Sequence, residues 1–526
     1  MPVAVILLGC ALRLRGYLAG DSLGIDEAAL ARNVIDRSWI ELLRPLDYAQ
    51  VAPPGFLLLE KSAVSVLGTS ELALRLFPLL FGIGSVWLSW EVARRVLPNV
   101  PALCAVAFVA SHTWLIVFSA QVKQYSAETA AALLIVLLAL GAARIGATLR
   151  RQIAIGAIGA VTVLFSFTAV FVLAGAALTT AVLALRGGDD SRREGLIVPA
   201  FWAAAALGGV LIGRASLTPV DAGYLQWFWQ ANFVNLPPQE LRDLLRIEGR
   251  IEELFGSVQR FRTGEIWVAL TGLGVWSLIA RRRPDLASLL SVPLLLVVAA
   301  AALHLYPLNP RLQLFLVPLL LLLAAEGVGF GQRMILSVQS RAAVLPIILA
   351  ALLTAYSLWE GALVRASYDP ATVVQHIATH RRSGDRIYVH YAAGQAFVYY
   401  AARNGIEPSE YVIGSCSHGS GRTYLEELDR LRGHDRVWIA MTSFGEEPAL
   451  FTSYLDAIGR RRETIGDAAA IESEDLRGAF GYLYDLTESP RSASVSPDRF
   501  ELPDGFREAE PYRWTCHGVF TPLPHH

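Results

Sequence analysis

Charge is scarce in this 526-residue chain. Only 17% of its residues are Asp, Glu, Lys or Arg, whereas 54% are hydrophobic, and an ordinary soluble domain has about 25% charged residues. This balance excludes a soluble enzyme. Lysine is almost missing and occurs only at Lys61 and Lys123. The net charge of -1 offers no general attraction for nucleic acid, so the few charges inform only through their positions.

Long apolar runs dominate the first two thirds of the chain. A helix that crosses the hydrocarbon core of a membrane needs about 20 apolar residues, and about eleven segments meet or approach that length. They lie near residues 2–19, 72–97, 100–118, 124–143, 152–168, 169–186, 195–214, 264–281, 286–304, 312–330 and 342–363. The run from Ile153 to Leu185 fits two tight spans or one tilted helix. The sequence predicts a multi-span α-helical membrane protein.

Arginine positions predict the orientation of these spans. Every second loop is basic, and basic loops stay on the cytoplasmic side. With eleven spans, the N-terminus is expected in the cytoplasm and the C-terminus outside, in a bacterial cytoplasmic membrane. Arg13 and Arg15 interrupt the first apolar run, and we expect them either to snorkel to the outer interface or to indicate a start further upstream. No cleavage-site pattern follows, so this segment is predicted to be a retained anchor.

Three outer segments are longer than turns, and function is expected there. Residues 20–71 and 215–263 belong to the predicted membrane domain, residues 1–363. Residues 364–526 have a soluble composition, with short β-rich runs between helix-like stretches. They predict an extracytoplasmic α/β domain with a largely parallel sheet. This domain lacks a Gly-rich dinucleotide fingerprint, a Walker loop and zinc-spaced Cys or His residues.

Cysteine is also scarce, with four residues. Cys10 and Cys104 fall in predicted helices, where a thiol is a small apolar side chain. Cys416 and Cys516 fall in the predicted outer domain, where conditions are oxidising, so a disulfide between them is expected. The alternative is two unpaired buried thiols.

An acidic pair, Asp26 and Glu27, opens an amphipathic helix directly after the first span. Acidic residues in a first helical turn suit the helix dipole without any further role. At the mouth of a membrane bundle, however, a carboxylate can deprotonate an acceptor hydroxyl. Adjacent helical residues point about 100° apart, so one is expected to act as the base and the other to hold the fold or the acceptor.

The two lysines lie in different outer segments. Lys61 follows the prolines of the first outer segment in a second amphipathic helix, and Lys123 precedes the fourth span. Lysine can pair with a phosphate as a compact charge, so both are candidate donor-phosphate ligands. The alternative for Lys61 is an interface anchor. Gln124 and Tyr125, next to Lys123, are further site candidates.

Glu128 lies about one turn inside the fourth span, and an ionisable residue at membrane depth is a functional candidate. The alternative is that Glu128 is only a carboxylate at the end of a helix, bound by Lys123 or Gln124. The loop HLYPLNPR adds Tyr306, Asn309 and Arg311. Arg311 lies on the side where basic residues are rare, and a lipid-linked phosphate would explain it.

Aromatic residues gather in the outer segment 215–263. Tyr224, Trp227 and Trp229 lie close together with Asn232. An aromatic belt at the membrane interface accounts for them without a ligand.

Together these motifs resemble the GT-C superfamily of membrane glycosyltransferases, near the glycosyltransferase family 39 group of protein O-mannosyltransferases and aminoarabinose transferases. The resemblance covers roughly residues 1–330. It depends on Asp26-Glu27, on Pro53-Pro54, on ELALRLFPLLFG with Arg75, and on YPLNPR. It implies eleven to thirteen spans, two interface helices in the first outer loop, a polyprenyl-phosphate sugar donor and transfer with inversion.

The resemblance also implies roles for individual residues. Asp26 resembles the catalytic carboxylate with Glu27 as its partner, and Arg311 resembles the arginine that binds the donor phosphate. Aminoarabinose transferases have a Glu-Lys pair just before the prolines, where this chain has Gln50-Val51-Ala52. No divalent-cation ligand set stands out, although Asp26 with Glu128 could recruit one.

The sequence therefore predicts a glycosyltransferase that moves a sugar from a polyprenyl-phosphate donor to a lipid, glycan or protein acceptor of the cell envelope, on the outer face. One alternative is a polyprenyl-linked polysaccharide ligase or polymerase. The other is a lipid-linked sugar transporter or flippase, against which the chain shows no paired repeats with broken helices.

Overall fold

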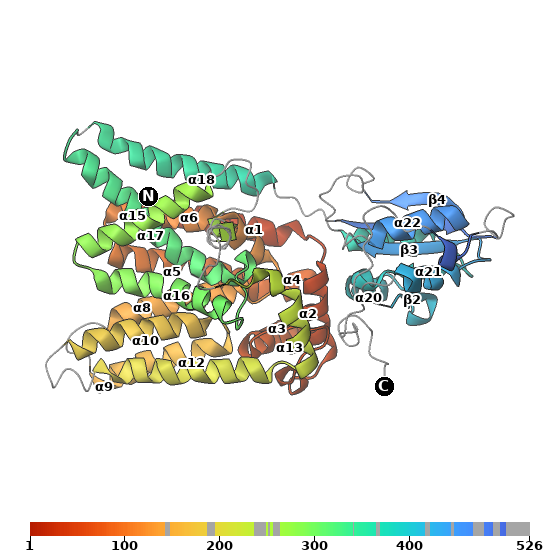
Figure 1. Cartoon of the computed structure of the whole chain (residues 1–526), viewed down its shortest axis with the longest axis horizontal. Helices are drawn as coiled ribbons and strands as arrows, with labels where there is room; N and C mark the ends of the chain where they lie inside the picture. The colour runs from red at the N-terminus through yellow and green to blue at the C-terminus, as the bar shows by residue number, and fades with distance from the viewer. Residues whose placement is uncertain are drawn as a thin grey trace.

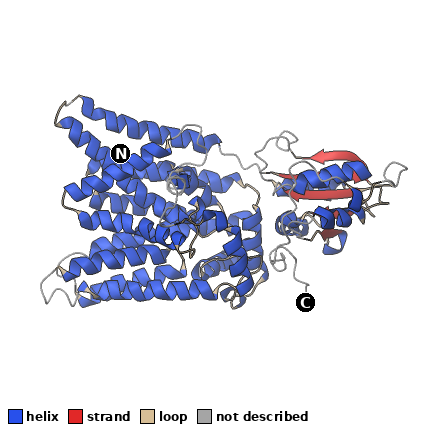
Figure 2. Cartoon of the chain, in the orientation of Figure 1, coloured by secondary structure: helices blue, strands red, loops and turns tan. Residues whose placement is uncertain are grey.

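The computed structural model contains a bundle of helices and a smaller domain with a β-sheet beside one end of the bundle (Figure 1). All strands of the described residues lie in the smaller domain (Figure 2). The structure describes residues 1–142, 148–186, 195–235, 249–250, 253–255, 263–339, 341–363, 369–415, 421–442, 447–466, 478–487 and 495–500. The predicted fold class, a multi-span helical protein with a C-terminal α/β domain, is confirmed.

Every apolar segment predicted to span the membrane is helical. The helices are α1 (Pro2–Ala19), α5 (Leu76–Val96), α6 (Asn99–Ser111) with α7 (Thr113–Val117), α8 (Tyr125–Ala142), α9 (Leu149–Val161), α10 (Ala169–Leu185), α12 (Ile197–Ala215), α15 (Gly264–Ala280), α16 (Pro284–Ala302), α17 (Val317–Leu336) and α18 (Leu345–Leu363). The run from 153 to 185 is therefore two helices, separated by η3 (Thr162–Leu164).

Not all of these helices are long enough to cross a membrane by themselves. Among the described residues, seven are sufficiently long and apolar, or eight if the bent pair α6–α7 forms one span. The helices α10 and α15 are apolar but shorter. The predicted count of eleven spans is thus not confirmed, although the positions of the helices are.

The break between α6 and α7 explains the position of Arg13, for which the sequence left two alternatives open. The axis bends by 57° here, which leaves carbonyl groups at the end of α6 without helical partners. Arg13 of α1 is fully buried and donates hydrogen bonds to the carbonyl oxygens of Val109 and Ala110, at 3.2 and 3.3 Å. The expectation that Arg13 snorkels to the interface is therefore wrong.

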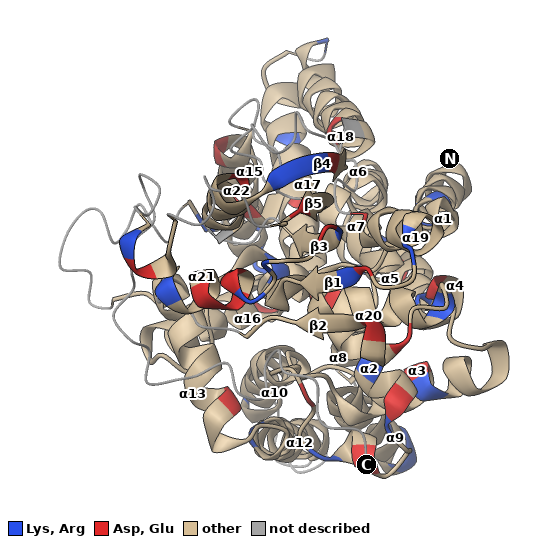
Figure 3. Ribbon diagram, turned by 90° about the vertical axis from the view of Figure 1, so that its right-hand side faces the viewer, with Lys and Arg blue, Asp and Glu red and all other residues tan. Residues whose placement is uncertain are grey.

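The first outer segment contains the two predicted amphipathic helices. They are α2 (Ile25–Asp36) and α3 (Pro54–Leu67), joined by η1 (Glu41–Leu43) and followed by the short α4 (Glu71–Leu74). Pro54 begins α3, where a proline costs no helical hydrogen bond. In Figure 3 coloured charged segments mark α2 and α3, whereas the long helix α10 is mainly tan.

The C-terminal domain has a five-stranded sheet in the order β2-β1-β3-β5-β4. The strands are β1 (Arg386–Val389), β2 (Tyr411–Ile413), β3 (Val437–Thr442), β4 (Arg460–Ile465) and β5 (Ala479–Asp485), and the helices are α19 (Pro370–His380), α20 (Gly394–Arg403), α21 (Gly421–Asp429) and α22 (Glu447–Ile458). Strand β1 pairs in parallel with β2 and β3, but β5 pairs antiparallel with β3 and β4. The prediction of a largely parallel sheet is wrong for this half.

Helix α20 joins the C-terminal domain to the first outer segment. The backbone N–H of Leu23 donates to Tyr400 Oη at 2.8 Å, and Tyr399 Oη donates to the carbonyl of Thr69 at 2.8 Å. One cluster of buried apolar side chains continues from α2 and α3 into α20, with Leu30 and Phe56 on one side and Phe397 on the other.

The predicted disulfide lies outside the described part of the chain, because Cys416 and Cys516 are both in undescribed segments. It stays a prediction. Cys10 and Cys104 are free thiols in α1 and α6, as their apolar surroundings in the sequence indicate.

Candidate functional site

The first turn of α2 fixes the acidic pair. Gly24 precedes the helix in an extended conformation, and its N–H donates to Glu27 Oε2 at 3.1 Å, which caps the helix start. Asp26 is one residue earlier and points elsewhere, because adjacent helical side chains diverge. The two carboxylates therefore have different environments.

Arg311 reaches Asp26 from a point 285 residues later in the chain. Its Nη1 donates to Asp26 Oδ2 at 2.8 Å. Arg311 lies at the start of η6 (Pro310–Leu316), which packs against α8. The side chains of Asp26 and Arg311 remain 44% and 36% exposed, so a ligand can reach this ion pair.

Lys123 adds a second cation to the cluster. It lies in the turn before α8, is buried, and donates from Nζ to Gln50 Oε1 at 2.6 Å. Gln50 precedes the Pro53-Pro54 turn. Gln50 is one of the residues that this chain has where aminoarabinose transferases have a Glu-Lys pair. It thus orients Lys123, which lies in the loop before α8.

The two cations determine the charge state of Asp26. Burial would raise the pKa of its carboxyl group, but the positive charges of Lys123 and Arg311 outweigh this effect and hold the pKa below its ordinary value. Burial lowers the pKa of the Lys123 ammonium, an effect that the charge of Asp26 opposes. Asp26 is therefore an ionised carboxylate, able to accept a proton, beside two groups suited to a phosphate.

Glu27 is occupied by structural contacts. It forms a buried salt bridge with Arg75, 3.1 Å from Nη2 to Oε1, and accepts the backbone N–H of Val122 at 2.8 Å. Arg75 also donates to the carbonyl of Asp21 at 2.5 Å. Of the two roles predicted for the acidic pair, these contacts give Glu27 the one of holding the fold, since they tie the start of α2 to the turn that carries Lys123.

Two other candidates, Glu128 and Tyr306, lie near each other. Glu128 is buried in α8 and hydrogen-bonds the side chain of Thr168, so neither Lys123 nor Gln124 satisfies it as the sequence alternative expected. Tyr306 Oη donates to the carbonyl of Leu312 at 2.9 Å. Burial, with the nearby Glu128 and Tyr125, raises the pKa of Tyr306 well above its ordinary value.

The remaining candidates from these two loops support the backbone. Asn309 Oδ1 accepts the backbone N–H of Arg311 at 3.2 Å and so caps η6. Gln124 Nε2 donates to the carbonyl of Val51 at 3.4 Å. Tyr125 begins α8 and packs its ring edge-on against Phe118, with ring centroids 4.8 Å apart.

The structure does not bring Lys61 to the site. Its Nζ donates to the carbonyls of Val34 and Ile35 at 2.9 and 3.1 Å. These carbonyls lie at the C-terminal end of α2, about 12 Å along the helix from Asp26 at 1.5 Å per residue. A cation there satisfies carbonyls that end the helix, so the interpretation of Lys61 as a phosphate ligand is not supported.

Sequence reasoning missed an aromatic contact to the cluster. The guanidinium of Arg311 lies 5.0 Å from the ring centroid of Trp229. Trp229 directly follows α13 (Pro219–Phe228). Burial raises the pKa of Tyr224 to about 12, with a contribution from the charge of Asp26. The close spacing of aromatic residues was visible in the sequence, but an aromatic belt predicts the same pattern.

The site has no metal ligands of its own in the described residues, where no group of three or more His, Cys, Asp or Glu side chains could hold an ion. Glu128 hydrogen-bonds Thr168 and Asp26 pairs with Arg311. The pair suggested as a cation site is therefore engaged with other groups.

A bundle of apolar helices, two helices after the first apolar helix and a carboxylate paired with an arginine 285 residues later agree with the GT-C fold that the resemblance implies. A family model described as dolichyl-phosphate-mannose-protein mannosyltransferase matches residues 51–212. The predicted resemblance to GT-C glycosyltransferases is confirmed, and the family model carries the same enzyme class.

Solved structures show the same fold at low sequence identity. The chain is similar to ArnT from Cupriavidus metallidurans in the apo state, with 12% identity, 91% of this chain and 97% of that chain covered, and a TM-score of 0.51. ArnT from the same organism bound to undecaprenyl phosphate gives the same identity, coverage and TM-score. No curated protein sequence matches the chain.

Proposed function

We propose that this chain transfers a sugar from a polyprenyl-phosphate donor to an envelope acceptor, on the outer face of a bacterial cytoplasmic membrane and with inversion at the anomeric carbon. The observation that carries the proposal is the ion pair between Asp26 and Arg311 with Lys123 beside it. A general base and two phosphate-binding cations are what this reaction requires. The similar ArnT structure bound to undecaprenyl phosphate supports a donor of this class.

In the proposed reaction the donor phosphate replaces Asp26 as the partner of Arg311. The free carboxylate then accepts the proton of the acceptor hydroxyl while the hydroxyl oxygen attacks the anomeric carbon. The bond between that carbon and the phosphate oxygen breaks, and polyprenyl phosphate leaves with its charge held by Arg311 and Lys123. Preorganised charges of this kind stabilise a transition state by several kcal/mol.

Donor binding also changes the basicity of Asp26. Without donor, Lys123 and Arg311 hold its pKa below the ordinary value. The donor phosphodiester carries one negative charge. Placed between the two cations, it neutralises part of their field, so the proton affinity of Asp26 rises when the donor is in place. The base is thereby strengthened at the step that needs it.

The proposed reaction takes place on the outer face, and the positions of the charged residues support this orientation of the chain in the membrane. Arg311 is the only Lys or Arg in residues 303–316, whereas three arginines, 281–283, lie at the other end of α16. This difference favours the outer side for the cluster and for the C-terminal domain. We place the N-terminus in the cytoplasm on the same argument. The acceptor is a lipid, glycan or protein of the envelope.

The test uses the full chain in proteoliposomes with a panel of labelled polyprenyl-phosphate monosaccharides. Release of free polyprenyl phosphate with one donor supports the proposal. Arg311→Ala should lower kcat/KM for that donor by about 100-fold, whereas Arg382→Ala, at an exposed arginine of the C-terminal domain, should leave it unchanged. Release of polyprenyl diphosphate would favour a ligase, and movement of intact donor would favour a flippase.

A further inference from the structure

A large cavity lies between the first outer segment and the C-terminal domain, at the other end of α2 from Asp26. Its volume is about 930 Å³, near the upper end of the range of about 300–1,000 Å³ for small-molecule sites. One wall comes from α2, η1 and the following turn, and the other from α20, η9 (Pro408–Glu410) and β2. Neither domain forms this cavity alone.

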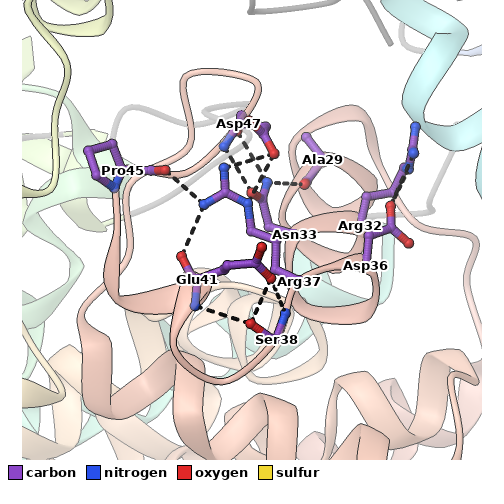
Figure 4. A network of polar contacts seen from close by, with 9 residues as sticks. All are labelled: Ala29, Arg32, Asn33, Asp36, Arg37, Ser38, Glu41, Pro45 and Asp47. Atoms are coloured by element: carbon purple, nitrogen blue, oxygen red, sulfur yellow. Dashed lines mark hydrogen bonds and ion pairs between the residues drawn. The ribbon is translucent and has the colours of Figure 1, made fainter. Parts of the chain in front are cut away.

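The wall on the outer segment is held by a network of polar contacts (Figure 4). Arg37 forms a salt bridge with Asp47 at 2.8 Å and donates to the carbonyl of Pro45 at 2.8 Å. Asn33 Oδ1 accepts the backbone N–H of Asp47 at 2.9 Å. Because these contacts fix both side chains and backbone, the wall is preorganised before any ligand arrives.

The lining is charged but balanced. Four arginines and four carboxylates line the cavity, and all but Arg403 and Glu407 belong to the wall on the outer segment: Arg32, Arg37, Arg44, Arg403, Asp36, Glu41, Asp47 and Glu407. Arg44 is exposed, and no carboxylate of the described residues lies within salt-bridge distance of it. Such a surface offers many donors and acceptors and no net charge. It suits a ligand with many neutral hydroxyl groups better than an anionic ligand or an apolar peptide side chain.

The cavity is connected to the reaction site by two short paths. Arg32 is six residues after Asp26 on α2, about 9 Å along the helix axis. Asp47 and Tyr48 line the cavity, and Gln50, two residues later, accepts the hydrogen bond of Lys123. Between them Tyr48 and Ala49 both have positive φ, 64° and 49°, which is costly for residues with a side chain. Such strain concentrates at ligand sites.

We infer that this cavity is an acceptor subsite that binds a neutral saccharide portion of the acceptor, remote from the reacting hydroxyl. The inference rests on the proposed function only in treating the saccharide as part of the acceptor. The binding of a saccharide in this cavity does not depend on it. The inference assigns a function to the C-terminal domain, because α20 and β2 form one wall of the cavity. A saccharide held there extends along α2 toward Asp26.

Binding is tested on the full chain in nanodiscs, without donor, by hydrogen exchange. The probes are neutral gluco-, manno-, galacto- and arabino-oligosaccharides, an anionic uronate oligosaccharide and a random-sequence peptide pool. At least one neutral oligosaccharide should slow exchange in residues 41–48 and 402–411. Ala402→Trp, which fills the cavity from an exposed position of α20, should weaken that binding at least tenfold, and Arg44→Ala about threefold.

Matched controls are Ser383→Trp and Arg382→Ala, in an exposed turn that does not line the cavity, and both should bind as the wild type does. No slowing with any neutral oligosaccharide, slowing only with the anionic probe or the peptides, or wild-type affinity in Ala402→Trp would overturn the inference. With an active donor and acceptor, Ala402→Trp should raise the KM for acceptor and leave that for donor unchanged. Saccharide binding without release of polyprenyl phosphate would refute the proposed function alone.

Discussion

Two clusters of the bundle, around Asp26 and around Glu326, each place one carboxylate near two cations, and they differ in how open the carboxylate is. Asp26 has Arg311 and Lys123 near it, accepts a hydrogen bond from Arg311 and remains 44% exposed. Glu326 of α17 is fully buried, and its Oε1 accepts hydrogen bonds from Ser277, Arg281 and Arg333 at 2.6, 2.9 and 2.7 Å. Similar charged groups thus leave the carboxylate accessible to solvent at Asp26 and inaccessible at Glu326.

The helices around Glu326 show why that cluster is closed. A Cβ atom on Gly274 of α15 would lie 1.9 Å from the carbonyl oxygen of Leu323, and one on Gly327 of α17 would lie 2.0 Å from that of Leu270. The two backbones are therefore in contact, which leaves no room for a ligand. Charge alone does not identify a functional site in this membrane bundle. The solvent access of the carboxylate separates the proposed site from the closed cluster.

Asp26→Asn should have the largest effect on turnover, a loss of about 1,000-fold or more, equivalent to about 4 kcal/mol. The amide cannot accept the proton of the acceptor hydroxyl. Rapid-quench measurement of sugar transfer checks this, and the thermal midpoint of unfolding should stay within a few degrees of the wild type. A variant with near-normal turnover would refute the assignment of the base.

Glu326→Ala should show the opposite pattern. Removing the buried carboxylate leaves two arginines without their common partner, and the cost is about 3 kcal/mol, the lower end for a broken buried pair, because both arginines are more than a third exposed. Urea unfolding in mixed micelles measures the loss. Turnover per folded molecule should remain within about twofold, and a loss comparable to that of Asp26→Asn would remove the contrast between the clusters.

The acid limb of the pH profile should move when a cation is removed from the open cluster. Lys123 and Arg311 hold the pKa of Asp26 below its ordinary value, so the wild-type kcat/KM should persist on acidification until the pH passes below the ordinary range of an aspartate. In Lys123→Gln one of these charges is gone, and the fall should begin at higher pH. An unchanged acid limb would indicate that another group controls it.

Trp229→Leu should have the smallest effect. A cation–π contact contributes about 0.5–2 kcal/mol, so losing the ring near Arg311 should raise the KM for donor between about twofold and thirtyfold with little change in kcat. Trp227→Leu, two residues away on α13, serves as the control. Equal effects of both substitutions would point to general packing of α13 rather than to Arg311.

Much of the bundle could be predicted from the sequence because its signal is local. Every apolar run is a helix, and the boundaries follow from flanking arginines and prolines. The break at His112 could not be predicted, since it lies inside a continuous apolar segment and its free carbonyls are satisfied by Arg13 and Ser357 of other helices. The edge strand β4 was missed for a related reason: its sequence RRRETI is charged, and only pairing with β5 makes it a strand.

The site was predictable in part. Asp26, Lys123 and Arg311 stand out because each is a charge that topology leaves unexplained, and the structure brings all three together. Lys61 met the same criterion but does not lie at the site. The sequence could not show that α2 ends where the ammonium group of Lys61 can bind its last carbonyls. Gln50 could not be assigned either, since its role depends on a contact with Lys123, 73 residues away.

The contact between Arg13 and α6 has a consequence for how the chain enters the membrane. An arginine in the middle of a spanning helix costs about 2.5–3.5 kcal/mol during insertion, and in the mature fold the carbonyls of Val109 and Ala110 compensate for it. Those carbonyls are synthesised almost a hundred residues later. Before α6 is synthesised, Arg13 has one of its three carbonyl partners, that of Gly9 in its own helix. We therefore expect the first span to reach its final position only after α6 has entered the membrane.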